Sequence, residues 1–150
     1  MTEINFYHLQ RASLDRALPK LLERVLQGGH RAVVVAGSPE RVEHLNTVLW
    51  TYDSASFLPH GTAADGHGAR QPLYLTAEEE NPGRADILVL VDGADPVFKD
   101  EFDRCLDMFD GNDDRALAAA RERWKAAKAA GHPVAYWKQG TAGGWERAEG

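Results

Sequence analysis

The sequence predicts an α/β domain in which a mostly parallel sheet is covered by helices on both faces. Short apolar runs alternate along the chain with segments of helical periodicity, as they do in such domains. Residues 32–36 and 87–91 are continuously apolar, which is typical of strands buried on both faces of a parallel sheet. A length of 150 residues fits one domain. We therefore expect a three-layer α/β/α domain over residues 1–138 and a Gly-rich, frayed tail over residues 139–150.

The first half of the chain contains two predicted strand–helix units. Residues 4–9, rich in β-branched and aromatic side chains, indicate a strand. A helical apolar stripe follows over residues 14–27, where Pro19 predicts a late start or a bend. After the strand at residues 32–36, Ser38 and the Pro-Glu pair behind it favour the start of a second helix.

The second half begins with a long predicted loop over residues 51–71, and loops longer than about 12–15 residues are usually functional or mobile. The pattern then predicts five elements in order: a strand at 72–75, a strand at 87–91, a helix at 97–109, a helix at 114–130 and a strand at 133–137. The helix at 97–109 is predicted from its spaced apolar residues, which are Phe98, Phe102, Leu106 and Phe109.

Composition excludes several classes of protein. The net charge of −6 disfavours wrapping of duplex DNA over the whole surface, because phosphate contacts need clustered Lys and Arg. No apolar run approaches the roughly 20 residues that span a membrane, and the N-terminus has no secretory signal pattern. A single cysteine rules out an internal disulfide. We therefore expect a cytoplasmic protein with no membrane partner.

Nucleotide chemistry is not supported by the motifs. The strand at 32–36 is followed by Gly37-Ser38-Pro39, and neither Gly-x-Gly-x-x-Gly nor a phosphate-binding loop with Lys is present. Asp92 follows a strand, where α/β enzymes often place an acid, but the Asp-Gly pair is equally a plain turn. We expect no nucleotide cofactor.

Metal and nucleophile chemistry are also weakly indicated. The six histidines include no pair with metal-ligand spacing on a helix. His60, His67 and Asp65 share the long loop, which we interpret as an ordinary solvated loop rather than a metal or acid–base site. Cys105, predicted on the apolar side of the helix at 97–109, is interpreted as core. We expect no catalytic residue, no metal and no cofactor.

The most informative element is the helix over residues 114–130. Arg121, Lys125 and Lys128 share one face, and Trp124 lies at the border of that face with the apolar one. One interpretation is a solvated face with Trp124 in the core. The other is a cationic patch beside an aromatic side chain, which suits an acidic peptide or a free carboxylate better than duplex DNA.

A second group is aromatic. Trp50 and Phe57 flank the start of the long loop, and such side chains are frequent interface anchors. The alternative, that they cover the edge of the sheet, stays open on composition alone.

Several short motifs resemble a known family. They are Phe6-Tyr7-x-Leu9, Leu45-x-x-x-Leu49-Trp50, Ser56-Phe57-x-Pro59-His60 and Ala120-Arg121-Glu122-Arg123-Trp124-Lys125 followed by Ala130-Gly131. In order and spacing over residues 4–137, they resemble the χ (chi) accessory subunit family of bacterial DNA polymerase III. The resemblance implies a Rossmann-like fold without a nucleotide site. It also implies a non-catalytic place in the clamp-loader assembly during DNA replication, with DNA contacted mainly indirectly.

The resemblance further implies two partner contacts. The acidic C-terminal tail of single-stranded DNA-binding protein is expected to bind Arg121, Trp124, Lys125 and Lys128. The ψ (psi) subunit, or another clamp-loader component, is expected to bind Trp50 and Phe57. Trp124 stands where relatives can carry Tyr, and Lys128 where they can carry Arg, so charge and aromaticity are kept while the bidentate geometry changes.

Two alternatives remain beside this interpretation. One is a direct binder of single-stranded nucleic acid that uses the basic helix over 114–130. The other is a small α/β enzyme with its site in the loop over 51–71.

Overall fold

The structure is a computed structural model that describes residues 2–10, 12–52, 59–62, 71–139 and 144–148. Within these residues the elements, in chain order, are β1 (Glu3–Leu9), α1 (Leu14–Gln27), β2 (Ala32–Val35), α2 (Pro39–Thr51), β3 (His60–Thr62), β4 (Leu73–Thr76), β5 (Ile87–Leu90), the 3₁₀ helix η3 (Val97–Glu101), β6 (Arg104–Asp110), α3 (Asp114–Ala129), β7 (Val134–Gln139) and β8 (Trp145–Ala148).

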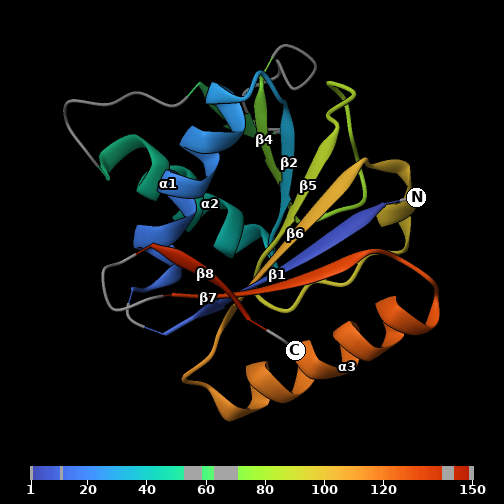
Figure 1. Cartoon of the computed structure of the whole chain (residues 1–150). Coiled ribbons are helices and arrows are strands. Elements are labelled where there is room, and N and C mark those ends of the chain that lie inside the picture. The colour runs from blue at the N-terminus through green and yellow to red at the C-terminus, as the bar shows by residue number, and fades with distance from the viewer. Residues whose placement is uncertain (1, 11, 53–58, 63–70, 140–143, 149–150) are drawn as a thin grey trace.

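The strands form one sheet in the order β3-β4-β2-β5-β6-β1-β7-β8. All neighbouring pairs are parallel except the last, in which β8 runs antiparallel to β7. The first helix carries the chain from β1 to β2 on one side of the sheet, whereas α3 carries it from β6 to β7 on the other (Figure 1). The sheet is therefore covered on both faces, which confirms the predicted α/β fold with a mostly parallel sheet.

Two apolar cores hold the layers together. Beneath α1 and α2, the side chains of Leu18, Leu22 and Leu45 pack on the sheet. On the opposite face, α3 packs through Ala120 and Ala127 against a set that is rich in aromatic residues, which includes Phe6, Phe102, Phe109 and Tyr136. Complete burial of one such large apolar side chain stabilises a fold by about 1.5–3 kcal/mol.

The first helix begins at Leu14, so Pro19 does not delay its start. Pro19 is buried and belongs to the helix interior. The second helix follows the predicted signals: Pro39 occupies its first turn and the Ser38 hydroxyl accepts the Arg41 amide. The predicted helix over 114–130 is also confirmed, and the Asp113 carboxylate caps it by accepting the Arg115 and Ala116 amides.

The prediction of a helix over residues 97–109 is wrong. Only a short 3₁₀ helix, Val97–Glu101, forms there, and the chain continues as strand β6 between β5 and β1. Because β6 is buried on both faces, its apolar residues do not alternate with polar ones, and the period of a strand is hidden. Cys105 is thus a strand residue, and burial in the core raises the pKa of its thiol.

Two further segments differ from the sequence-based expectation. Residues 145–148, within the tail predicted to be frayed, form β8 and add a strand to the sheet. Residues 60–62, within the predicted loop, form the edge strand β3, in which His60 is buried. The remaining part of the proposed loop site, Asp65 and His67, lies outside the described residues.

Candidate functional site

The exposed face of α3 brings together the four residues predicted as one binding site. Arg121, Lys125 and Lys128 are exposed, and Trp124 is half-buried beside them. The Lys128 ammonium lies 5.5 Å from the centre of the Trp124 ring, within the range of a cation–π interaction. This surface, defined by Arg121, Trp124, Lys125 and Lys128, is called the α3 patch below.

Trp124 connects the α3 patch to the core. Its ring meets Phe6 edge-on, with centroids 5.5 Å apart, and meets Tyr136 edge-on at 5.7 Å. These contacts hold the indole in one orientation while part of it stays accessible. The ring of Trp124 is therefore a core contact on one side and partly accessible on the other.

The charges of the α3 patch are only weakly neutralised within the protein. Lys125 lies 3.5 Å from Glu122 in an exposed pair, and such surface pairs contribute about 0–1 kcal/mol. Among the described residues, Arg121 forms no ion pair.

Residues of β1 and β7 extend this region beyond what helical spacing predicts. The charge of Arg121 reaches the buried His8 and Tyr136, whose side chains contact each other at 2.6 Å (Nδ1 to the hydroxyl). Lys138, two residues after Tyr136 on the same strand, faces the same side. Its cross-strand neighbour is Glu146. Strand alternation is the sequence signal that places Lys138 here.

Arg123 is not part of the α3 patch, although it lies among those residues in the sequence. Its side chain is buried and forms an ion pair with Asp107 of β6. The surface therefore carries less positive charge than a count of basic residues along the helix suggests.

The second predicted surface is only partly described. Trp50, near the end of α2, is 55% exposed, which is high for a large apolar side chain. Its ring lies 4.8 Å from that of His60 on the edge strand β3. Phe57 lies outside the described residues. Because α2 and α3 cover opposite faces, Trp50 and the α3 patch are separate surfaces (Figure 1).

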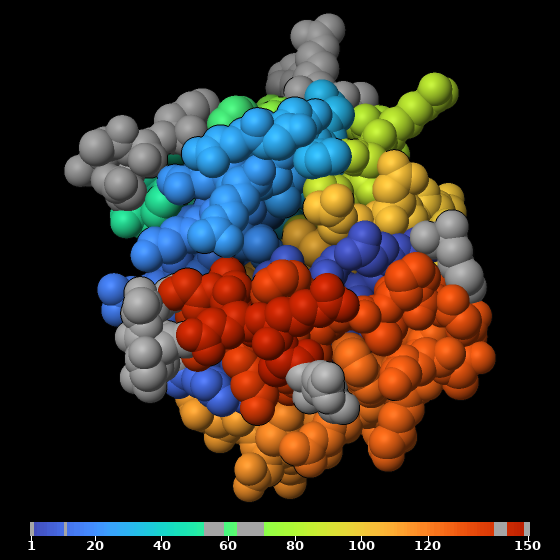
Figure 2. Space-filling view, viewed as in Figure 1, coloured from blue at the N-terminus to red at the C-terminus, as the bar shows by residue number. Residues whose placement is uncertain are grey.

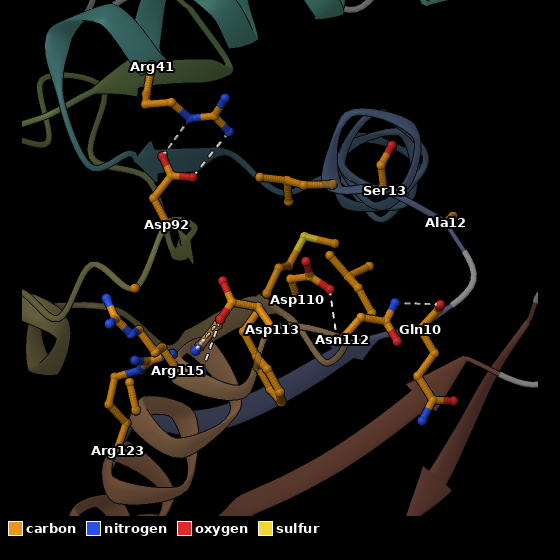
Figure 3. A pocket seen from close by; sticks show the side chains of 17 residues that line it. Gln10, Ala12, Ser13, Arg41, Asp92, Asp110, Asn112, Asp113, Arg115 and Arg123 are labelled. Carbon is orange, nitrogen blue, oxygen red and sulfur yellow. Dashed lines mark hydrogen bonds and ion pairs between the residues drawn. The ribbon is translucent and has the colours of Figure 1, made fainter.

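A cavity of about 710 Å³ lies where β1, β5 and β6 end and where α1 and α3 begin (Figure 3). Helices leave these strands toward opposite faces of the sheet, and ligands of doubly wound folds bind at such a point. Basic and acidic side chains line it in equal number: Arg41, Arg115 and Arg123 against Asp92, Asp110 and Asp113. Because these charges balance, the lining favours neither an anionic nor a cationic ligand.

Asp92 is a structural residue of this cavity. Its backbone is left-handed (φ 59°), and its carboxylate accepts two hydrogen bonds from Arg41, each 3.1 Å long, and one from the Gly37 amide, also 3.1 Å. The hydrogen bond to Asp92 raises the pKa of Arg41. The Asp92 carboxylate thus lies at the turn between β2 and α2 and accepts the Gly37 amide there. Nucleotide-binding folds bind a phosphate at a strand–helix turn of this kind. Asp92 is thus a turn residue whose carboxylate binds groups of the protein itself.

The described histidines contact other groups rather than one another. His44 pairs with Asp15 at 2.7 Å, and His30 pairs with Asp86. His132 lies 3.0 Å from the Thr2 carbonyl oxygen and 3.3 Å from a carboxylate oxygen of Asp100. Within the part of the chain that the structure describes, no group of three or more His, Cys, Asp or Glu side chains is arranged to hold a metal. Among the same residues, none of the helices has the length and apolar character needed to cross a bilayer.

Comparison with known proteins adds a family to this description. The model of a family described as "DNA polymerase III chi subunit, HolC" matches residues 1–135. The "Probable DNA polymerase III subunit chi" of Rickettsia prowazekii (strain Madrid E) is 33% identical over 95 residues, which cover 63% of this chain and 58% of that protein. The "DNA polymerase III subunit chi" of Escherichia coli (strain K12) is 28% identical over 115 residues, which cover 75% of this chain and 78% of that protein.

Proposed function

The chain belongs to the DNA polymerase III chi subunit family, and from that premise we propose that it is a non-catalytic accessory subunit which links two other proteins. One partner is the acidic C-terminal tail of single-stranded DNA-binding protein, bound at the α3 patch. The other is ψ or another clamp-loader component, bound at the surface around Trp50. We place the activity of this chain in the cytoplasm, in replication of the bacterial chromosome.

The observation that carries this proposal is the arrangement of Arg121 beside Trp124. An exposed guanidinium without an ion-pair partner among the described residues lies one helical turn from an indole held by Phe6 and Tyr136. A carboxylate accepts two parallel hydrogen bonds from a guanidinium, and an apolar side chain next to it in a peptide packs on the ring. A tail that is acidic and ends in an apolar aromatic residue matches both features.

Separate surfaces support a linking role. The α3 patch and Trp50 lie on elements that cover opposite faces of the sheet, so one chain has room for two partners at once. Neither surface overlaps the cavity between α1 and α3.

The test is a calorimetric titration of the isolated tail peptide into the full chain and into two variants of α3. Arg121→Ala removes the central guanidinium of the α3 patch. Arg115→Ala removes the same type of side chain from the first turn of the same helix, outside the patch, and is the matched control. The proposal requires tight binding to the wild type and to Arg115→Ala, with a large loss for Arg121→Ala. Equal affinity of a folded Arg121→Ala variant contradicts it.

A further inference from the structure

A second basic surface lies on the other side of the sheet, between α1 and β8. Arg16, Lys20 and Arg24 follow one another at intervals of four residues along α1 and are all exposed. Together with Trp145 on β8 they line a depression of about 240 Å³, whose other lining residues are Ala12, Ala17, Leu21 and Gln139. Figure 2 shows α1 in blue alongside the C-terminal strands in red. This surface of Arg16, Lys20, Arg24 and Trp145 is called the basic groove.

The two acidic residues of α1 interact elsewhere. Asp15 pairs with His44 of α2 at 2.7 Å, and Glu23 accepts a hydrogen bond of 2.5 Å from Tyr52, which follows α2. Arg16, Lys20 and Arg24 form no ion pair with any residue that the structure describes. The helix thus directs its acids toward α2 and leaves its cations unneutralised at the basic groove.

Aromatic side chains continue the basic groove across the sheet. The Trp145 ring meets Tyr7 of β1 edge-on at 5.0 Å, and Tyr7 lies nearly parallel to Trp137 of β7, at 12° and 6.5 Å. All three rings are half-buried. Arg147 is the cross-strand neighbour of Trp137 and shares the face of Trp145. A surface of three rings is therefore bordered by cations on two sides.

Positively charged side chains lie close enough to this aromatic surface to affect the pKa of Tyr7. Burial raises the pKa of Tyr7, and the charges of Arg104 and Arg24 oppose that rise, while Glu3 adds to it. Cations of α1 and β6 therefore act on Tyr7, whose ring contacts those of Trp145 and Trp137.

We propose that the basic groove binds single-stranded nucleic acid directly, with phosphates along Arg16, Lys20 and Arg24 and a base packed against Trp145. Cations four residues apart on a helix are separated by about 6 Å along its axis, so the row meets an anion whose charges repeat. A phosphate backbone has such regularly repeating charges. Unstacked bases pack on aromatic side chains, and a duplex does not offer them.

This inference is independent of the proposed tail site, because the two surfaces share no residue. It also differs from the sequence-based alternative, in which the basic helix over 114–130 was the nucleic-acid site. In the structure Arg123 of that helix is buried in its ion pair with Asp107, and it does not contribute to the surface of α3.

The experiment is a fluorescence-anisotropy titration of labelled oligo-deoxythymidine with the full chain, compared with a duplex of the same length. Three phosphate contacts on a single strand give a slope of about −2 for log affinity against log salt. Affinity should fall roughly 20-fold between about 50 and about 200 mM salt. A duplex that binds as tightly as the single strand, or an oligonucleotide that does not bind, overturns the proposal.

Two pairs of variants locate the binding. Lys20→Glu should weaken binding of the oligonucleotide by about tenfold and reduce the salt slope. The matched control, Arg84→Glu, makes the same charge change at an exposed residue before β5 and should bind as the wild type does. Trp145→Ala should weaken binding of the oligonucleotide about tenfold without changing the salt slope. Trp145→Phe should keep most of the affinity, because an aromatic ring remains at this position.

The acidic tail peptide, titrated in parallel, separates this proposal from the preceding one. If Lys20→Glu loses binding of the peptide but not of the oligonucleotide, the basic groove is a site for acidic peptides. That outcome overturns the nucleic-acid assignment. Oligonucleotide binding that is insensitive to both Lys20→Glu and Trp145→Ala overturns it as well. Thermal melting shows whether each variant is folded.

Discussion

Arg123 of α3 donates two hydrogen bonds to the Asp107 carboxylate of β6, from Nε to Oδ2 at 2.7 Å and from Nη2 to Oδ1 at 3.1 Å. The side chains are only 9% and 3% exposed. This buried pair joins the helix that carries the α3 patch to a central strand of the sheet. It fixes the helix in rotation, so Arg121 faces solvent while Arg123 faces inward.

Breaking this pair should destabilise the fold strongly. Arg123→Met keeps volume but leaves a buried carboxylate without its partner, which should cost about 3–5 kcal/mol. Urea unfolding measures the loss. The double variant Arg123→Met/Asp107→Leu should recover most of it, because an apolar pair of similar volume replaces the buried ions. A single variant that loses less than about 1 kcal/mol would contradict this account.

Gly111 should not tolerate a side chain. A Cβ added there would lie 1.8 Å from His8 Nε2 and 2.8 Å from the Leu9 carbonyl oxygen, and His8 is itself held by Tyr136. Overpacking of this kind costs about 1–3 kcal/mol, so Gly111→Ala should lower the free energy of unfolding by that amount. Gly144→Ala, where a Cβ meets no atom within 4 Å, is the control and should match the wild type.

Stability should depend on the protonation of His8. Burial lowers the pKa of His8, and the positive charges of Lys138 and Arg121 lower it further, with Asp110 opposing them. The unfolded chain, with an ordinary histidine pKa of about 6.5, therefore binds the proton more readily. The stability that the fold gains from a neutral His8 is therefore fully present above the pKa of the unfolded chain. It is lost as pH falls through the pKa of the folded state.

The melting temperature of the wild type should accordingly fall more steeply from about pH 7 to about pH 5 than that of His8→Gln. The glutamine variant, less stable at neutral pH, removes the titrating group but keeps a polar side chain. Parallel pH profiles for the two proteins would show that His8 does not carry the effect.

Within the α3 patch, Arg121 and Lys128 should contribute differently to binding of the tail peptide. Loss of a charge-assisted contact at a desolvated centre costs about 2–5 kcal/mol, so Arg121→Ala should lower affinity by roughly 30-fold or more. Lys128→Ala should lose less, mainly through a slower association rate that vanishes at high salt. Stopped-flow binding at two salt concentrations separates these effects. Equal losses for both variants would show that charge alone determines recognition.

Trp50→Ala should leave the fold intact and weaken a partner other than the tail peptide. Because the side chain is 55% exposed, its removal should shift stability by no more than about 0.5 kcal/mol. Removal of a central interface aromatic costs about 2 kcal/mol or more, which titration with ψ measures. Phe57→Ala is expected to act in the same way. Val97→Ala, a change at an apolar side chain that is 85% exposed, is the control. An unfolded Trp50→Ala variant would make Trp50 a core residue.

The fold class and most helices follow from patterns in the sequence alone. The cap at Ser38 and the apolar stripe over residues 14–27 are local signals, and the helices predicted from them formed. The helix predicted from the spaced apolar residues of 97–109 did not form. The α3 patch was predictable for the same reason, because residues three and four apart on a helix share a face. The interface role of Trp50 stays a prediction; the structure shows only that its side chain is exposed.

Which residues meet across the sheet depends on tertiary packing. Strand β6 was missed because its apolar residues look helical until β1 and β5 pair with it, and pairing between distant segments leaves no local period. The same cause hid the partnership of Arg123 with Asp107. It also hid the basic groove, since β8 brings Trp145 next to residues of α1 such as Arg24, which lies 121 residues earlier in the chain. Helical faces follow from local geometry, whereas burial, ion pairing and surfaces shared between elements depend on contacts that form only when the layers pack.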